Sequence, residues 1–357
     1  MSRVKNYWGV SLVLVLLLNG MAMAEETLID INRAIELSQQ ENIELAMAGL
    51  ELANAELDYQ KNKLSNLATA SRVVELQGEL AIIKARENYR QIKNKVIIET
   101  IGQFLQLIQL DREIAISEEE VELQKRKLQG VEAQVEVGYR GLLELFEQQR
   151  EYQKALVALE KALDDLQQQL KELRMAICLE PEEEIVLPDL EEPMIWEAEE
   201  GSSFELALEN NALMGIRERQ ITLASANLNR ASVADTPKLE LKKLANDLEL
   251  ANFNLVLEKQ KLETAIQKNY YRYKQAIKNM DITRKAKRQA LENLKIIREQ
   301  ETAGLVTKND LLEGRVSLLK AEKAHLAAII NYYISQLQLK ETMGIELEVV
   351  IDVQKKL

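Results

Sequence analysis

The sequence predicts an all-α protein, a tandem repeat of long antiparallel coiled-coil helices with two three-helix copies per chain. The 357 residues are only 4% aromatic and 29% charged, and Leu, Ala, Glu, Lys and Gln recur with helical periodicity. Three of the four prolines, Pro181, Pro188 and Pro193, lie between two long segments that contain no other proline except Pro237. The pattern therefore indicates two long helical segments joined by an extended linker.

The two segments look like copies of one ancestral sequence. Residues 138–147 align with 304–313, and the same offset places 175–180 on 341–346 without a gap. A tandem duplication explains these matches, and residues 36–42 and 205–211 correspond at a slightly longer offset. We therefore divide the chain into a signal peptide at 1–24, a first helical repeat at 25–178, an acidic, proline-containing linker at 179–202, a second helical repeat at 203–346 and a C-terminal tail at 347–357.

The N-terminal segment has the pattern of a secretory signal. Arg3 and Lys5 precede an apolar run at residues 10–18, and small residues follow at 22–24. The apolar run is shorter than the roughly 20 residues of a membrane-spanning helix, and an uncleaved anchor is the alternative. We expect cleavage after Ala24 and an exported protein of the cell envelope.

Charge and cysteine content argue against a nucleic-acid-binding protein and against a fold held by disulfides. Without Arg3 and Lys5 the chain has 44 basic and 58 acidic residues, a net charge of −14. Nucleic-acid affinity depends on Lys and Arg neutralising phosphates, so we expect no nucleic-acid partner. The single cysteine, Cys178, allows no internal disulfide. Because Cys178 aligns with Gly344 just past a helix end, we expect it to fill space rather than react.

Each repeat has three predicted helices. In the first copy, a helix at residues 30–67 is followed by a break at 65–71, a very long helix at 72–137 and a turn at 138–141. The third helix has apolar residues spaced alternately by four and three, as in a coiled-coil seam. These are Tyr152, Leu156, Leu159, Leu163, Leu166, Leu170, Leu173 and Ile177.

The second copy repeats this plan. We predict helices at 203–233, 238–302 and 309–343, with a break at 235–237 and a turn at Gly304. At 1.5 Å per residue each middle helix is about 100 Å long and each flanking helix about 45 to 55 Å. The two short helices of a copy can therefore stack end to end beside the long one, which predicts a tall, curved helical wall. In the last helix Ala321, Ala324, Ala328 and Leu339 form a second apolar stripe, so we expect both flanks to meet neighbours.

This plan resembles the TolC-like outer-membrane factors, the exit ducts of tripartite efflux pumps and type I secretion systems. Residues 137–179 and 303–345 show the family pattern of a Gly-containing turn, an acid-bearing Asp-Leu-Leu-type helix start, an Ala-rich middle and a Leu-x-x-x-x-Gly end. The resemblance covers nearly all of the mature chain. It implies a TolC-like α-helical tunnel of twelve helices closed by three protomers. It also implies a periplasmic adaptor protein and an inner-membrane ABC or RND pump as partners.

One departure from the family concerns the membrane. Family members insert a β-hairpin between the first and second helices of each copy, and these hairpins close a transmembrane barrel. Here the corresponding places hold only residues 65–71 and 231–237, whereas two spanning strands need about 9 to 11 residues each. We therefore expect the β-barrel strands to be absent and expect no insertion into the outer membrane.

The candidate functional residues lie at the two hairpin tips, whose turns contain Gly138, Gly141 and Gly304. The resemblance places the acids that match Asp310 and Glu313 at the constricted tunnel entrance. Glu144 and Glu147 follow Gly138 at the same intervals, six and nine residues, as the first pair follows Gly304. In a trimer these acids would form stacked carboxylate rings that favour cations and raise one another's pKa.

A second interpretation of the same acids is purely structural. Acids in the first turn of a helix complement the helix dipole, and Thr307 with Asp310 resembles a capping box. The arginine with which the family latches the entrance would fall at Val306, so any latch in this chain differs.

The sequence predicts no catalytic site. With one histidine, His325, one cysteine and no nucleophile or phosphate-binding motif, we expect neither enzyme activity, nor a cofactor, nor a metal site. We expect His325 to be a packed or surface residue, the acidic linker to be solvated rather than to bind cations, and the tyrosines to pack between helices. The tyrosines are Tyr270, Tyr271, Tyr273, Tyr332 and Tyr333. The favoured function is efflux or secretion of small molecules or proteins; the alternative is a non-conducting cell-envelope scaffold.

Overall fold

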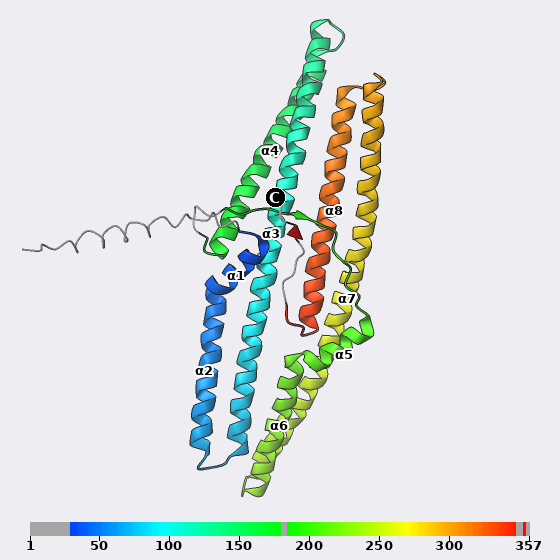
Figure 1. The fold of residues 1–357 in the computed structure, drawn as a ribbon. Coiled ribbons are helices and arrows are strands. Elements are labelled where there is room, and N and C mark those ends of the chain that lie inside the picture. Colours follow the sequence, from blue (N-terminus) through cyan, green and yellow to red (C-terminus); the bar gives the residue numbers. More distant parts are fainter. Residues whose placement is uncertain (1–28, 180–183, 348–352, 355–357) are drawn as a thin grey trace, which may run out of the picture.

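The computed structural model describes residues 29–179, 184–347 and 353–354 (Figure 1). The predicted signal peptide lies outside these residues, as do 180–183 of the linker and most of the C-terminal tail. The described residues form eight α-helices and one two-stranded sheet. The helical fold class predicted from the sequence is therefore confirmed.

The first copy consists of four helices arranged around one long helix. These are α1 (Ile31–Glu41), α2 (Ile43–Asn66), α3 (Arg72–Glu136) and α4 (Leu142–Ala176). The 65-residue α3 is contacted by α2 along its first half and by α4 along its second half (Figure 1). The end-to-end stacking inferred from helix lengths is thus confirmed.

The second copy has the same arrangement. It contains α5 (Glu200–Asn210), α6 (Ala212–Val233), α7 (Lys238–Thr302) and α8 (Lys308–Thr342). The helix α7 has 65 residues, as α3 has, and it packs against α6 in its first half and α8 in its second. The two copies therefore have middle helices of equal length.

One expectation fails in both copies, because residues 30–67 and 203–233 do not form single helices. Asn42 and Asn211 have extended backbones, with ψ of 117° and 110°, and each ends one helix and begins the next. The Asn42 side chain accepts a hydrogen bond from the Leu45 backbone N–H at 2.9 Å, and Asn211 accepts one from Leu213 at 2.9 Å. Each asparagine thus caps a new helix start. As a result α1 turns to pack on α3, and α5 turns to pack on α7.

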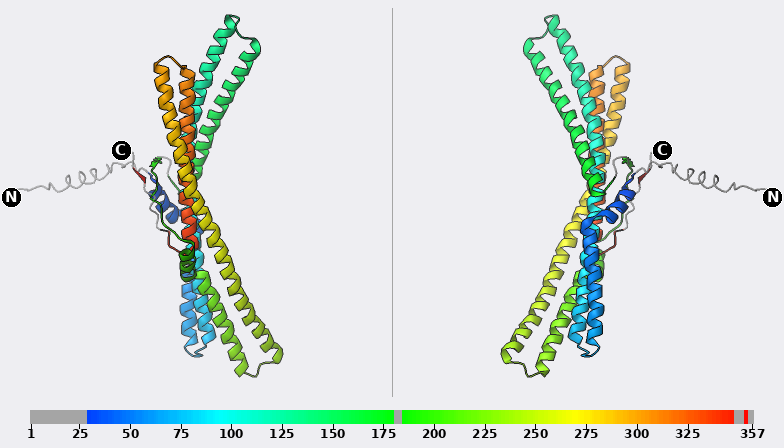
Figure 2. Two further views of the ribbon diagram at one scale, coloured as in Figure 1. Left: turned by 90° about the vertical axis from the view of Figure 1, so that its right-hand side faces the viewer. Right: turned by 90° about the vertical axis from the view of Figure 1, so that its left-hand side faces the viewer.

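The helices of the two copies join side by side into a wall. The helix α3 contacts both α6 and α8 of the second copy. One half of the wall therefore follows the order α2, α3, α6, α7, and the other half follows α4, α3, α8, α7 (Figures 1 and 2). Consequently α2 and α4 form one edge of the wall, and α7 forms the other.

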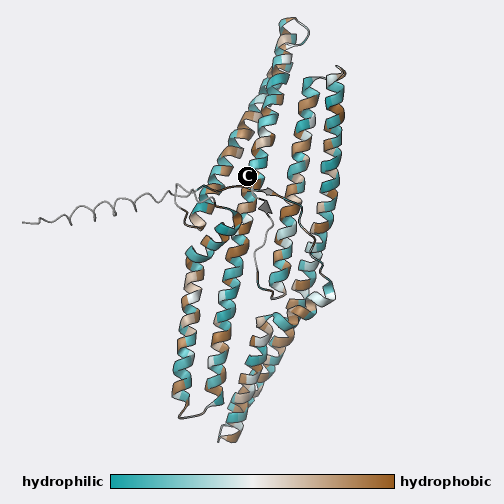
Figure 3. Cartoon of the chain, in the orientation of Figure 1, coloured by the Kyte–Doolittle hydropathy of each residue, from teal (hydrophilic) through white to brown (hydrophobic). Residues whose placement is uncertain are grey.

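The core lies midway along the wall, where α1 and α5 cross. The largest fully buried side chains there include Phe104 on α3, Tyr273 on α7, Tyr332 on α8 and Ile177 just after α4. Apolar and polar residues alternate along every long helix (Figure 3). No helix among the described residues has an apolar stretch long enough to span a membrane.

The linker is extended at residues 184–199, as expected, whereas its residues 200–202 already belong to α5. Strand β1 (Asp189–Leu190) pairs antiparallel with β2 (Val353–Gln354). In addition, the Ile29 backbone forms a parallel bridge with Ile185, in which Ile29 N–H donates to the Glu184 carbonyl at 2.9 Å. These short pairings are the only departure from an all-α fold among the described residues, and they join the linker to residues 353–354 and to Ile29.

The second stripe of α8 meets neighbours within the chain. Because α8 lies between α3 and α7, Ala328 and Leu339 are buried, at 1% and 0% exposed, whereas Ala324 is exposed. Lys323 on the same helix pairs with Glu113 of α3 at 2.6 Å. Most of the stripe therefore joins the two copies of one chain, and only part of it is open to another chain.

Candidate functional site

Both hairpin tips are built on the same backbone turn. Gly138 and Gly304 follow the ends of α3 and α7 with φ of +73° and +72°, in the left-handed region that favours glycine. The next residue in each turn donates its N–H back to the helix, Tyr139 to Gln134 and Leu305 to Gln300, both at 2.8 Å. This hydrogen-bonded helix end reverses the direction of the chain sharply. It places the first turns of α4 and α8 at one end of the wall.

The acids of the second tip are engaged within the chain. The Asp310 carboxylate accepts hydrogen bonds at 2.7 Å from both the backbone N–H and the hydroxyl of Thr307. The Thr307 hydroxyl in turn accepts from the Asp310 N–H at 3.3 Å, so the capping box suggested by the sequence is present. The hydroxyl of Thr307, followed by its backbone N–H, lowers the pKa of Asp310.

Glu313 lies one turn further along α8 and reaches the other copy. Its carboxylate pairs with Lys127 of α3 at 2.5 Å, and its side chain is 52% exposed. Asp310 and Glu313 both line a groove of about 400 Å³ between α7 and α8, which also contains Val306. The structure thus brings these two acids together at the mouth of one groove.

The acids of the first tip are more open. Glu144 accepts a hydrogen bond at 3.4 Å from the N–H of Gly141, the residue that precedes α4, and Glu147 is exposed. They belong to the other hairpin, and among the described residues no hydrogen bond or ion pair joins them to Asp310 or Glu313. The first tip also exposes apolar side chains, namely Val137, Tyr139, Leu142, Leu143 and Phe146, whereas the second tip exposes Leu305.

The two edges of the wall expose apolar stripes. On α2, Ile43, Leu50, Leu57 and Leu64 recur every seven residues and are 61% to 76% exposed. The stripe on α7 runs nearly the whole length of the helix, through Leu239, Leu250, Phe253, Leu257, Tyr271, Ile282 and Ile296. By contrast, neither α3 nor α8 exposes a large hydrophobic side chain anywhere along its length. Unpaired apolar surface is therefore concentrated at the edges of the wall.

Aromatic side chains of α7 and α8 hold the linker against the middle of these two helices by hydrogen bonds. We call its residues 184–199 the strap. The N–H of Trp196 donates to the hydroxyl of Tyr332 at 2.9 Å, and that hydroxyl donates to the Met194 carbonyl at 3.0 Å. The Tyr273 hydroxyl donates to the Trp196 carbonyl, and the Tyr273 and Tyr332 rings lie 5.5 Å apart. Burial, followed by the hydrogen bond with Tyr332, raises the pKa of Tyr273.

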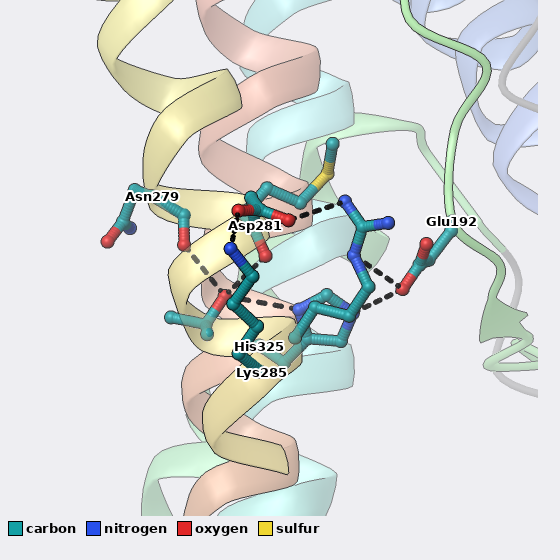
Figure 4. Close-up of polar contacts among 8 residues, drawn as sticks. Glu192, Asn279, Asp281, Lys285 and His325 are labelled. Carbon is teal, nitrogen blue, oxygen red and sulfur yellow. Dashed lines mark hydrogen bonds and ion pairs between the residues drawn. The ribbon is translucent and has the colours of Figure 1, made fainter. Parts of the chain in front are cut away.

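A second tie joins the strap to the only histidine (Figure 4). His325 is 4% exposed, its Nε2 lies 3.1 Å from Glu192 of the strap, and its Nδ1 lies 3.1 Å from the hydroxyl of Thr283. A neutral ring satisfies both contacts when Nε2–H donates to Glu192 and Nδ1 accepts from the Thr283 hydroxyl, whose proton is then shared with the Asn279 carbonyl 2.9 Å away. Burial lowers the pKa of His325, although Glu192 opposes that shift. Arg284 also approaches Glu192, at 3.5 Å.

Sequence reasoning foresaw these groups only in part. It expected His325 to pack and the tyrosines to lie between helices, which holds for the buried Tyr273, Tyr332 and Tyr333 but not for Tyr271, which is 57% exposed. It did not foresee that two tyrosine hydroxyls hold the strap, because Trp196 and Tyr332 are 136 residues apart in sequence. The available signal was an apolar Met-Ile-Trp run inside an otherwise acidic linker.

No group of three or more His, Cys, Asp or Glu is placed to hold a metal ion in the part of the chain that the structure describes. The candidate functional regions are surfaces, namely the two tips and the two edges of the wall.

The structure is similar to solved bacterial outer-membrane proteins. The *Campylobacter jejuni* CmeC outer membrane channel matches with a TM-score of 0.65 at 14% identity, over 88% of this chain and 85% of that one. The outer membrane protein VceC from *Vibrio cholerae* matches with a TM-score of 0.63 at 13% identity, over 89% and 97%. A membrane protein from *Pseudomonas aeruginosa* matches with a TM-score of 0.64 at 12% identity, over 89% and 91%.

Comparison at the level of sequence gives no further match. No model of a protein family matches the chain, and no curated protein matches it either. At 12% to 14% identity, similarity to these structures establishes a shared fold. The chain therefore has the TolC-like helical fold that the sequence predicted.

Proposed function

We propose that several copies of this chain, three by analogy with the TolC-like plan, join edge to edge into a helical duct that carries small molecules or proteins out of the cell. The observation that supports this most directly is the placement of exposed apolar side chains. They lie on α2 and α4 at one edge and on α7 at the other, while α3 and α8 between them expose none. Burying two such stripes against each other is favourable by roughly 25 cal/mol per Å² of apolar surface.

The hairpin tips are the proposed docking end. A periplasmic adaptor would contact the exposed apolar residues around Gly138, and an inner-membrane ABC or RND pump would act through that adaptor. Tyr139 and Phe146 are 82% and 61% exposed there, and exposed aromatic residues are frequent at protein interfaces. The proteins of similar structure are named as outer-membrane channels, which fits this proposal.

The acids at the tips are proposed to control passage. In a ring of three copies, Asp310 and Glu313 would be repeated around the axis beside Glu144 and Glu147 and would favour cations. The capping contacts of Asp310 are compatible with this role, because the hydrogen bonds from Thr307 favour its charged form.

The first test concerns the edges. Leu250→Glu with Phe253→Glu on α7, or Leu50→Glu with Leu57→Glu on α2, should reduce the native mass of the purified chain to that of one copy without loss of helicity. The matched control is Ala245→Glu with Asn252→Glu, two exposed positions about a third of a turn away on α7, which should keep the assembled mass. A wild-type chain that is already monomeric at high concentration would overturn the duct. An assembled ring that passes no solute would favour the envelope scaffold.

The second test separates an entrance from ordinary helix capping. In the assembled form, Asp310→Asn with Glu313→Gln should raise the melting temperature if acids from several copies crowd together, because repulsion is relieved. In the dissociated edge variant the same pair of changes should lower it, because the cap and the Lys127 pair are lost. If the melting temperature falls equally in both backgrounds, the acids are helix caps only.

A further inference from the structure

Charge is segregated between the two ends of the wall. The α2–α3 turn and the α6–α7 turn lie at the same end, opposite the tips (Figures 1 and 2). We call this the basal end and define it as residues 57–75 and 229–243. It contains seven Lys or Arg and four Asp or Glu, whereas the tips at 129–147 and 296–313 contain three and eight. In a chain of net charge −12 the basal end is thus locally positive.

The basic side chains of the basal end are exposed, and most of them are unpaired. Arg72 pairs with Glu75 at 2.6 Å. Within the described part of the chain, no ion pair involves the other six, which are Lys61, Lys63, Arg230, Lys238, Lys242 and Lys243. These cations are therefore available to an external anionic partner.

Large apolar side chains project among these cations. Leu64 and Leu67 from one turn are 70% and 75% exposed, and Val233 and Leu239 from the other are 90% and 85% exposed. Leu64 and Leu239 also end the apolar stripes of α2 and α7, whereas Leu67 and Val233 lie outside those stripes, at the very end of each hairpin. The basal end thus combines protruding apolar residues with surrounding Lys and Arg.

The turns that present these residues are tightly held. The Asn66 side chain donates to the Ser71 carbonyl at 2.9 Å, and it accepts from the Ser71 N–H and from the Thr69 hydroxyl, both at 2.8 Å. In the second turn, Pro237 precedes α7 and fixes the backbone at its start. Leu67 and Val233 are therefore displayed on fixed turns, and little ordering is required when they insert into a partner.

From this combination we propose that the basal end binds an anionic lipid surface. Apolar side chains that enter the boundary between headgroups and acyl chains, together with Lys and Arg at the headgroup level, are the two components of reversible binding to anionic membranes. The acidic tips would be repelled by the same surface, so the wall would stand with its tips pointing away from the lipid. This inference goes beyond the proposed duct and does not depend on it, because a scaffold would be anchored equally well.

The test uses the full chain as purified from cells that export it, with the same N-terminus in every variant, so that residues 1–24 cannot explain any difference. Co-sedimentation should show binding to vesicles that mix phosphatidylglycerol with phosphatidylcholine and little binding to phosphatidylcholine alone. Lys238→Glu with Lys242→Glu and Lys243→Glu should weaken binding about tenfold. The matched control reverses three exposed lysines further along α7, Lys259, Lys261 and Lys268, and should weaken binding less than about twofold.

A second pair of variants tests the apolar component. Leu67→Ser with Val233→Ser should reduce binding even in high salt, where electrostatic attraction is screened, whereas Val137→Ser with Leu305→Ser at the tips should not. The proposal is overturned if the wild-type chain does not bind anionic vesicles, or if the basal and control lysine reversals weaken binding equally. It is also overturned if the serine changes alter native mass instead of vesicle binding, which would assign the basal end to a protein contact. Native mass tests the proposed duct, whereas vesicle binding tests the proposed lipid contact, so the two proposals can fail independently.

Discussion

The inner helices and the edge helices of the wall have similar sequences, but the inner helices are covered on both flanks and the edge helices on one. Along α3 and α8 every large hydrophobic residue is at least partly buried, because each has neighbours on both flanks. Along α2 and α7 the same kinds of residue recur with the same helical spacing, yet one flank of each faces solvent. The comparison teaches that a coiled-coil pattern specifies a flank for packing without specifying which chain supplies the partner.

The difference also separates stability from assembly. Residues of the inner helices should determine whether one chain folds, whereas residues of the edges should determine whether chains associate. Matched residues of the same type at inner and edge positions can therefore test the comparison directly.

The largest expected effect comes from the phenylalanines of the two middle helices. Phe104 on α3 is 0% exposed, and Phe253 on α7 is 61% exposed. Phe104→Ala should lower the free energy of unfolding by about 3 to 5 kcal/mol, because it leaves a cavity in the core. Phe253→Ala should cost less than about 1 kcal/mol in the dissociated chain but should weaken assembly. Urea denaturation and native mass measure the two effects; equal destabilisation by both substitutions would contradict the comparison.

Glycines with the same backbone angle give the next largest contrast. Gly344 and Gly304 both have φ of +72°, but a Cβ on Gly344 would lie 2.8 Å from the Asn210 carbonyl oxygen, whereas one on Gly304 would meet nothing within 4 Å. Gly304→Ala should therefore cost about 1 to 2 kcal/mol from backbone strain alone. Gly344→Ala should cost about 2 to 4 kcal/mol, because backbone must also move. Thermal unfolding of the two variants measures the difference, and equal losses would show that the packing around Gly344 adapts.

Much of the fold could be predicted from the sequence because it depends on local signals. The helix at 238–302 has the predicted bounds, and the one at 72–137 differs by one residue, since proline and glycine mark their ends. The breaks at Asn42 and Asn211 were missed because an asparagine at either position is compatible with a continuous helix. Only the packing of α1 on α3 and of α5 on α7 favours the break.

The candidate site was less predictable, because it depends on tertiary neighbours. Periodicity showed two apolar flanks on α8, but not that α3 of the same chain covers most of the second one. The positions of Asp310 and Thr307 could be inferred, since a capping box is local. The pairing of Glu313 with Lys127 could not, because it joins the two repeats. The strap contacts of Trp196 likewise follow from the fold rather than from any local pattern.

A pair of tyrosines on α7 sharpens the comparison at a smaller scale. Tyr273 is fully buried and donates its hydroxyl to the Trp196 carbonyl, whereas Tyr271, two residues earlier, is 57% exposed. Tyr273→Phe should cost about 1 to 2 kcal/mol, because the strap loses a buried hydrogen bond. Tyr271→Phe should have almost no effect on the unfolding midpoint. Faster proteolytic cleavage within residues 184–199 of Tyr273→Phe would locate the loss at the strap, and unchanged cleavage would count against it.

The smallest expected effect concerns the pH dependence of the other strap contact. Burial lowers the pKa of His325 below its usual value of about 6.5, and the charged groups that influence it are Glu192 on the strap with Arg284 and Lys287 on α7. Because the folded pKa is depressed, the unfolded chain takes up a proton first as pH falls. The contribution of the neutral ring to stability is therefore complete above about pH 6.5 and decreases as pH falls below that value.

His325→Gln retains a donor and an acceptor for Glu192 and Thr283 but does not titrate. Between pH 8 and pH 5 the melting temperature of the wild-type chain should fall more than that of His325→Gln. The two chains share every other titratable group, so the difference between the two curves isolates the histidine. Parallel curves would show that protonation of His325 is accommodated at the strap without loss of stability.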